Sequence, residues 1–186
     1  MRVFAAVVPP QEALDHLAHT LGPFSEAYPD LGWLPQESWH ITLSYFGNIS
    51  LPDLKRLATA MKSVAESRPP DIGWLEGAAG LPAEATANSL CINVGSQSDG
   101  LADLSSAVVR SVQGFGWLLD RRSFKSILPV AQPASSADVR DVVSRLSTYS
   151  GSAWAVDAIT VVQARASTDG GATTYEVLDR HLIPED

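Results

Sequence analysis

The predicted strands and helices follow the same order twice along the chain, and this repeat constrains the fold more than any other feature. Strands are indicated by short runs of apolar and β-branched residues, and helices by apolar residues at every third or fourth position. Strands are expected at residues 3–8, 37–47 and 72–79 in the first half, and at 89–95, 121–132, 156–164 and 174–183 in the second. Amphipathic helices are expected between the first three strands of each half. No linker of disordered composition separates the halves, so a single bilobal domain is predicted, with approximate halves 1–80 and 89–186 that share one cleft.

Local signals predict several of the helix ends. Gly22-Pro23 should end the first helix, because glycine and proline are the strongest stop signals. Ser50 can cap the second helix and Ser135-Ser136 the fourth, since a serine hydroxyl can accept a hydrogen bond from a free amide of the first turn.

The strand expected at 37–47 carries the side chains best suited to chemistry. Its side chains alternate between two faces, with His40, Thr42 and Ser44 on one and Ile41, Leu43 and Tyr45 on the other. A histidine can gain or lose a proton near neutral pH, and a hydroxyl two residues away, at ~6.5 Å along a strand, can hydrogen-bond the same substrate. A lone His-x-Thr is also a common chance alternation, so this pattern needs support from the rest of the chain.

Composition narrows the possible functions. The 186 residues include 13 Lys and Arg against 21 Asp and Glu, a formal charge of −8, which argues against binding long nucleic acid through many phosphates. A short nucleotide in a local pocket is compatible with this charge. Cys91 is the only cysteine, so a reducing compartment is expected. The apolar run at 3–8 is too short for a membrane span, and a cytoplasmic protein without membrane contact is predicted.

Four segments together resemble the two-histidine (2H) phosphoesterase superfamily, and within it the RNA 2′,3′-cyclic phosphodiesterases, also called 2′-5′ RNA ligases. Arg2-Val-Phe-Ala-Ala-Val-Val-Pro-Pro10 is similar to the first strand and proline-rich turn of that family. Trp33-Leu-Pro35 and Trp39-His-Ile-Thr-Leu-Ser-Tyr-Phe-Gly47 are similar to its first HxTx motif. Gly170-Gly-Ala-Thr-Thr-Tyr-Glu-Val-Leu178 is similar to its closing strand. The resemblance covers nearly the whole chain.

The resemblance implies an α+β, bilobal fold with two antiparallel sheets, outer helices and a pseudo-twofold duplication around a central cleft. It implies that His40 and Thr42 form one catalytic motif, faced by a second motif from the other half. One histidine would act as base and the other as acid on the two sides of an in-line displacement at phosphorus, while the hydroxyls hold the phosphate. No metal or other cofactor is implied.

The second motif departs from the family pattern, which reads Arg-Pro-Phe-Arg-Pro-His-x-Thr-Leu-Ala-Arg. Ile127 stands at the position of the second His and Pro129 at that of its Thr. Isoleucine cannot transfer a proton, and each positioned acid or base typically contributes ~10²–10⁴-fold to the rate. Pro129 has no backbone N–H, which argues against an undisturbed central strand. If Ile127 packs into a core, this half of the site is lost.

Further residues could serve the same site. Lys125, Arg122 and Tyr45 are the expected substrate contacts, with Arg121 as a further positive charge, although a solvated basic turn is an alternative. His181 could replace the missing second His, but its charged neighbours favour an exposed structural role or a role at the edge of a sheet.

The sequence therefore predicts a degenerate RNA 2′,3′-cyclic phosphodiesterase. It would bind a nucleotide, or an RNA end with a 2′,3′-cyclic phosphate, beside His40 and Thr42, with weak or lost hydrolysis. The alternative is a non-catalytic nucleotide-binding or protein-interaction module that uses the same cleft. A monomer is expected.

Overall fold

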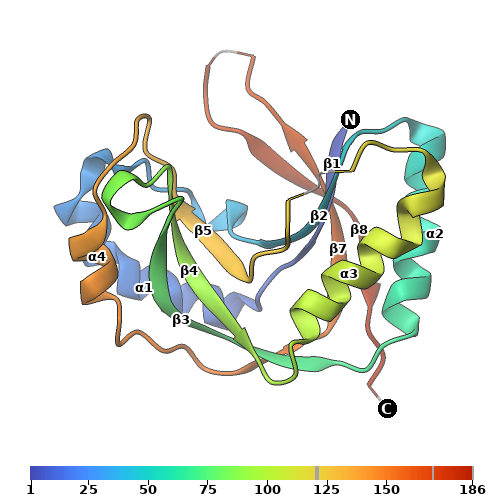
Figure 1. Ribbon diagram of the computed structural model, residues 1–186, viewed down its shortest axis with the longest axis horizontal. Coiled ribbons are helices and arrows are strands. Elements are labelled where there is room, and N and C mark those ends of the chain that lie inside the picture. The colour runs from blue at the N-terminus through green and yellow to red at the C-terminus, as the bar shows by residue number, and fades with distance from the viewer. Residues whose placement is uncertain (120–121, 169, 186) are drawn as a thin grey trace.

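The computed structural model describes residues 1–119, 122–168 and 170–185. Two four-stranded antiparallel sheets form the centre of the molecule, with α1 and α4 at one end and α2 and α3 at the other (Figure 1). The strands are β1 (Arg2–Val7), β2 (Ile41–Asn48), β3 (Asp71–Leu81), β4 (Ser89–Ser96), β5 (Ile127–Ala131), β6 (Trp154–Val156), β7 (Ala158–Arg165) and β8 (Thr174–Leu182). The helices are α1 (Gln11–Ala27), α2 (Leu51–Glu66), α3 (Gly100–Val112) and α4 (Arg140–Arg145), with 3-10 turns at Pro29–Leu31, Gln36–Ser38, Glu84–Thr86 and Gln113–Phe115.

The two sheets have the same internal arrangement. The first has the order β2-β1-β7-β8 and the second β5-β4-β3-β6. Each places at one edge the strand that carries a motif segment, β2 or β5, next to the strand that precedes it along the chain, β1 or β4. The predicted α+β architecture with two antiparallel sheets is confirmed.

One buried cluster fills the space between the helices and the sheets. In β1, Val3, Ala5 and Val7 belong to this core, whereas Phe4 and Ala6 form a small separate cluster with Val162 on the opposite face of the first sheet. Strand alternation thus gives the sheet one face for the core and one for a cleft. Most of the apolar residues predicted at helical spacing are buried, including Leu14, Leu17 and Leu21 on α1 and Leu101, Leu104, Val108 and Val112 on α3, whereas Leu54, Ala58 and Val143 are half-buried.

A short strap, defined here as residues 32–34, joins the two sheets immediately before the His40 segment. The Leu34 N–H donates to the Val130 carbonyl and the Gln132 N–H to the Gly32 carbonyl, each at 2.9 Å. Gly32 has a φ of +66°, and a Cβ added there would lie 2.2 Å from the Gln132 carbonyl oxygen. Only glycine combines this left-handed conformation with so close an approach.

Some predicted element ends are wrong. α1 continues through Gly22-Pro23 to Ala27, because Phe24 and Tyr28 still pack against the core and offset the cost of an internal proline. The serines at 135–136 do not cap α4, which begins at Arg140, where the Asp138 carboxylate accepts from the Arg140 N–H at 3.1 Å. Ser50 does cap α2, accepting from the Asp53 N–H at 3.2 Å.

Several predicted strands are shortened or interrupted. The strand expected at 37–47 begins only at Ile41, because residues 36–38 form a 3-10 turn. The strand at 156–164 is interrupted at Asp157, where the chain passes from β6 of the second sheet to β7 of the first. The strand predicted at 121–132 is confined to Ile127–Ala131, and Arg121 lies outside the described residues.

Candidate functional site

A cleft of about 1090 Å³ lies between the two sheets, with β2 on one side and β4 and β5 on the other. Residues of α3, residues 118, 119 and 122–125, and one residue of β8 complete its walls. Its polar and aromatic lining consists of His40, Thr42, Ser44, Tyr45, Asn88, Ser89, Ser105, Ser106, Arg110, Arg122, Ser123, Phe124, Lys125, Gln132 and Tyr175. The segments that contain His40 and Ile127, far apart in the sequence, therefore open into one space.

His40 lies one residue before β2 and is held between aromatic rings. Its ring centroid is 4.7 Å from that of Phe4 on β1 and 5.1 Å from that of Tyr175 on β8, and the Tyr175 ring meets it edge-on. Burial lowers the pKa of His40 from 6.5 to about 4, against the opposing effect of a hydrogen bond with the Ser38 backbone. The imidazole is therefore neutral at pH 7 and can accept a proton.

The alternation predicted along β2 gives the wrong face for Tyr45. The pairing with β1 shifts register twice, so that Thr42 lies opposite Ala6 and Tyr45 opposite Phe4. Such a shift leaves an extra residue in one strand and moves the following side chains to the other face. Tyr45, predicted on the face of Ile41, lies instead on the cleft face, 38% exposed and with its ring 5.1 Å from Phe4. His40, Thr42 and Tyr45 thus share the cleft.

On the opposite wall, β5 presents Ile127 and Pro129 to the cleft. Both are half-buried and line it, whereas Leu128 and Val130 between them are fully buried in the core. Ile127 is therefore not packed into the core. Pro129 is tolerated because β5 is an edge strand and because its pairing with β4 shifts register at this point.

Cys91 lies next to Pro129 in the sheet, on the wall opposite His40. Its Sγ is 3.3 Å from the Ser89 hydroxyl, and burial raises the pKa of the thiol, against smaller opposing effects of Ser89 and Lys125. A protonated, buried thiol is a poor nucleophile, so Cys91 acts as part of an apolar wall.

The charge of the cleft is opposite to that of the whole chain. Arg110, Arg122 and Lys125 line it, and among the described residues no lining side chain is Asp or Glu. The predicted substrate contacts Lys125, Arg122 and Tyr45 are thus brought together with His40 and Thr42 in one cleft. A local excess of cations in a chain of net charge −8 favours an anionic ligand.

His181 does not take part. It lies opposite Ile159, whose side chain belongs to the core, so His181 points to the helix side of the first sheet and away from the cleft. Its side chain is only 10% exposed, and its Nε2 lies 3.3 Å from an Asp179 carboxylate oxygen. The expectation that His181 is exposed is wrong, and the possibility that it replaces a second catalytic histidine is ruled out by its position.

Tyr175 and Arg110 are among the cleft residues that sequence reasoning missed. Tyr175 lies in the segment that resembles the closing strand of the family, but only the pairing of β8 with β7 places it next to His40. Arg110 carries no motif signal; it reaches the cleft because the Ser105 hydroxyl of α3 donates to the Leu43 carbonyl of β2 at 2.6 Å and fixes the helix beside that strand.

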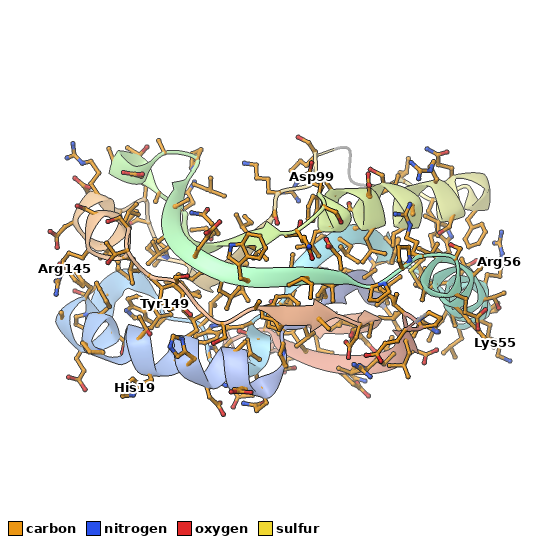
Figure 2. The ribbon with its side chains drawn as sticks, turned by 90° about the horizontal axis from the view of Figure 1, so that it is seen from below. His19, Lys55, Arg56, Asp99, Arg145 and Tyr149 are labelled. Atoms are coloured by element: carbon orange, nitrogen blue, oxygen red, sulfur yellow. The ribbon has the colours of Figure 1, made fainter. Side chains whose placement is uncertain are left out.

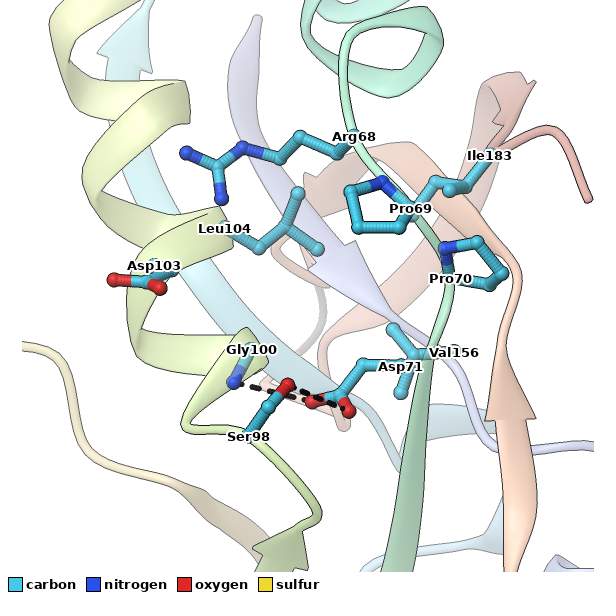
Figure 3. A pocket seen from close by; sticks show the side chains of 10 residues that line it. All are labelled: Arg68, Pro69, Pro70, Asp71, Ser98, Gly100, Asp103, Leu104, Val156 and Ile183. Carbon is cyan, nitrogen blue, oxygen red and sulfur yellow. Dashed lines mark hydrogen bonds between the residues drawn. The ribbon is translucent and has the colours of Figure 1, made fainter. Parts of the chain in front are cut away.

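A second, smaller hollow of about 90 Å³ lies beside the start of α3 (Figure 3). There the Asp71 carboxylate accepts from the Ser98 hydroxyl at 3.0 Å and from the Gly100 N–H at 3.1 Å. A Cβ at Gly100 would approach Asp71 Oδ2 to 2.1 Å. Asp71 therefore caps α3 from a neighbouring strand, and this hollow is explained by local structure.

His16 and His19 do not form a metal site with other ligands. His16 lies 3.4 Å from the Tyr149 hydroxyl, while His19 points away from the sheets on the outer side of α1 (Figure 2). Among the described residues no group of three or more His, Cys, Asp or Glu could hold a metal ion. No helix in the described part of the chain is long and apolar enough to cross a bilayer.

No protein-family model matches the sequence. An RNA 2′,3′-cyclic phosphodiesterase from Geobacillus stearothermophilus is 29% identical over 129 residues, which make up 69% of this chain but only 41% of that protein. The similarity is thus distant and leaves more than half of that relative without a counterpart.

Solved structures match along the full length. TT0787 of Thermus thermophilus superposes with a TM-score of 0.82 at 20% identity and covers 100% of both chains. LigT of E. coli, crystallised with 3′-AMP, gives 0.77 at 18% identity, with 99% of this chain and 98% of that chain covered. A further crystal structure, described as a phosphoesterase, gives 0.75 at 19% identity over 99% and 98% of the two chains. The chain therefore has the α+β, two-sheet fold of LigT and TT0787.

Proposed function

We propose that this chain is a distant, degenerate member of the RNA 2′,3′-cyclic phosphodiesterases of the 2H phosphoesterase superfamily. Its cleft would bind the phosphate of a nucleotide or RNA end, with the phosphate next to His40 and Thr42. Hydrolysis of a 2′,3′-cyclic phosphate would be weak or lost. The observation that carries this proposal is the shared cleft, in which His40 and Thr42 form one wall and Ile127 and Pro129 the other.

The electrostatics support a phosphate ligand. Thr42 can donate a hydrogen bond to a phosphate oxygen, and Lys125 and Arg122 supply positive charge from the β5 side. The distant relative acts, by its name, on RNA 2′,3′-cyclic phosphate, and LigT of the same fold has been crystallised with 3′-AMP and with NADP+. These ligands make a nucleotide the first choice for this cleft.

The chemistry supports a loss of rate. Opening a cyclic phosphate requires a base for the incoming water and an acid for the departing sugar oxygen, and the neutral imidazole of His40 can act only as the base. Ile127, across the cleft, has no proton to give. The missing acid should lower the rate by ~10²–10⁴-fold, or about 2.7–5.5 kcal/mol in the barrier.

Binding can be tested by calorimetric titration with 2′,3′-cyclic AMP and 3′-AMP. The wild type should bind both, and Thr42→Val and Lys125→Ala should each weaken binding by about 3- to 30-fold, since a hydrogen bond or charge to phosphate is typically worth about 0.5–2 kcal/mol. Lys62→Ala is the matched control, because Lys62 is an exposed cation on α2 that does not line the cleft. Absence of nucleotide binding by the wild type would overturn the proposal and favour a protein-interaction module.

A further inference from the structure

The two walls of the cleft differ in the groups that they offer for phosphate chemistry. The cleft holds one imidazole that can accept a proton, that of His40, with an apolar wall of Ile127, Pro129 and Cys91 opposite. It also holds three cations, Arg110, Arg122 and Lys125. A single phosphodiester carries one negative charge, so these cations exceed what one cyclic phosphate needs. The question is which phosphate bond can be broken with His40 as the base, without a second histidine as the acid, and with this much positive charge.

The answer depends on the leaving group. An ester releases a sugar hydroxyl, which leaves as a strongly basic alkoxide unless an acid protonates it. A phosphoanhydride releases a phosphate, whose second pKa is about 6, so it departs at neutral pH without needing a proton. Loss of the general acid therefore penalises esters far more than anhydrides.

We propose that the bond this cleft hydrolyses is a phosphoanhydride, and that its substrate is a nucleotide with two or more linked phosphates. This inference rests on the proposed function, because it uses the same phosphate position beside His40 and Thr42. In this reaction the departing phosphate lies next to the apolar wall that contains Ile127, where no proton needs to be transferred.

The step balances with water as the only co-reactant. The water oxygen forms a bond to the phosphorus held beside Thr42, and its proton passes to the His40 imidazole. The bond between that phosphorus and the bridging oxygen breaks, and the electron pair leaves with the departing phosphate. The imidazolium then returns its proton to solvent, so that nucleotide and water give a shorter nucleotide, phosphate and a proton.

The cations Arg110 and Lys125 fit the additional phosphates. Among the described residues neither Arg110 nor Lys125 has an ion-pair partner. Elsewhere most basic side chains do pair with a carboxylate, namely Arg56, Lys62, Arg140, Arg145, Arg165 and Arg180. Arg110 approaches from α3 and Lys125 from the segment before β5, so a chain of phosphates extending from Thr42 would meet positive charge on two sides.

The test compares ATP, ADP and 2′,3′-cyclic AMP as substrates of the wild type, with EDTA present to suppress contaminating metal-dependent hydrolases. Products are separated by ion-exchange chromatography, and binding of AMP is measured in parallel by calorimetry. Hydrolysis of ATP or ADP should exceed opening of the cyclic phosphate by ~10² or more. His40→Ala should abolish the anhydride reaction. Arg110→Ala and Lys125→Ala should raise KM for ATP. Lys62→Ala and Arg140→Ala replace exposed cations that pair with a carboxylate elsewhere, and should leave KM unchanged.

The double variant Ile127→His/Pro129→Thr gives a second readout. It should raise the rate on the cyclic phosphate by a much larger factor than the rate on ATP, because only the ester needs the added acid. AMP binding without ATP or ADP hydrolysis would overturn this inference and leave the proposed function standing. Hydrolysis of ATP that survives His40→Ala would also overturn it, whereas failure to bind any nucleotide would remove the proposed function itself.

Discussion

The environment of His40 predicts that this side chain lowers the stability of the protein at acid pH. The pKa of His40 is lowered from 6.5 to about 4 by burial between Phe4 and Tyr175. Above pH 6.5 the imidazole is neutral in both the folded and the unfolded chain. Between pH 6.5 and 4 the unfolded chain takes up a proton that the folded chain does not, so the free energy of unfolding falls as the pH falls. Below pH 4 the loss is complete.

The size of this effect follows from the two pKa values. Their difference corresponds to about 3 kcal/mol at about 1.4 kcal/mol per pH unit, and partial hydration of the half-buried ring reduces the expected loss to about 2 kcal/mol. Urea denaturation at several pH values between 7 and 4 measures it. His40→Gln should remove that part of the pH dependence, and His19→Gln, at an exposed position of α1, is the matched control.

Two results would refute this reasoning. One is a His40→Gln variant whose stability falls between pH 7 and 4 as steeply as that of the wild type. The other is an NMR titration in which the His40 ring protonates near pH 6.5. Either would mean that the aromatic contacts do not desolvate His40.

Three further predictions concern the scaffold of the cleft and are measured by urea denaturation. Gly32→Ala should destabilise the protein by more than Gly47→Ala. Both positions have a positive φ, which costs alanine about 1–2 kcal/mol, but only at position 32 would a Cβ also clash with a carbonyl. Equal losses of stability would show that this clash contributes nothing. Leu128→Ala should lower the free energy of unfolding by about 2–5 kcal/mol and Ile127→Ala by clearly less, since Leu128 is fully buried and Ile127 faces the cleft. The reverse order would mean that Ile127, and not Leu128, faces the core. Ser50→Ala should cost about 1 kcal/mol by removing the cap of α2, while an unchanged stability would argue against that cap.

Sequence patterns identify the fold and several residues that line the cleft, for physical reasons that the structure makes visible. Helical spacing correctly predicts the buried stripe of α3, and the run at 121–132 correctly predicts a strand, although only Ile127–Ala131 forms it. The register shifts of β2 have no comparable signal in the sequence, because a bulge depends on how β1 and β2 pair. This is why simple alternation predicts the wrong face for Tyr45.

Tertiary contacts account for the remaining differences. Tyr175 and Arg110 reach the cleft only through the pairing of β8 and the anchoring of α3 on β2, and neither could be inferred from local pattern. The burial of His181 has the same origin, since its charged neighbours suggest exposure, but its register with Ile159 turns the ring toward the core.

The central claim is that His40 acts without a proton donor opposite it, because Ile127 stands at the position of the second histidine. Restoring that histidine tests the claim most directly. The rate of 2′,3′-cyclic AMP hydrolysis is measured for the wild type, for Ile127→His/Pro129→Thr, and for this double variant with His40→Ala added. The account predicts a gain of ~10² or more in the double variant and its loss again when His40 is removed. A wild type that already hydrolyses the cyclic phosphate as fast as the double variant would contradict it.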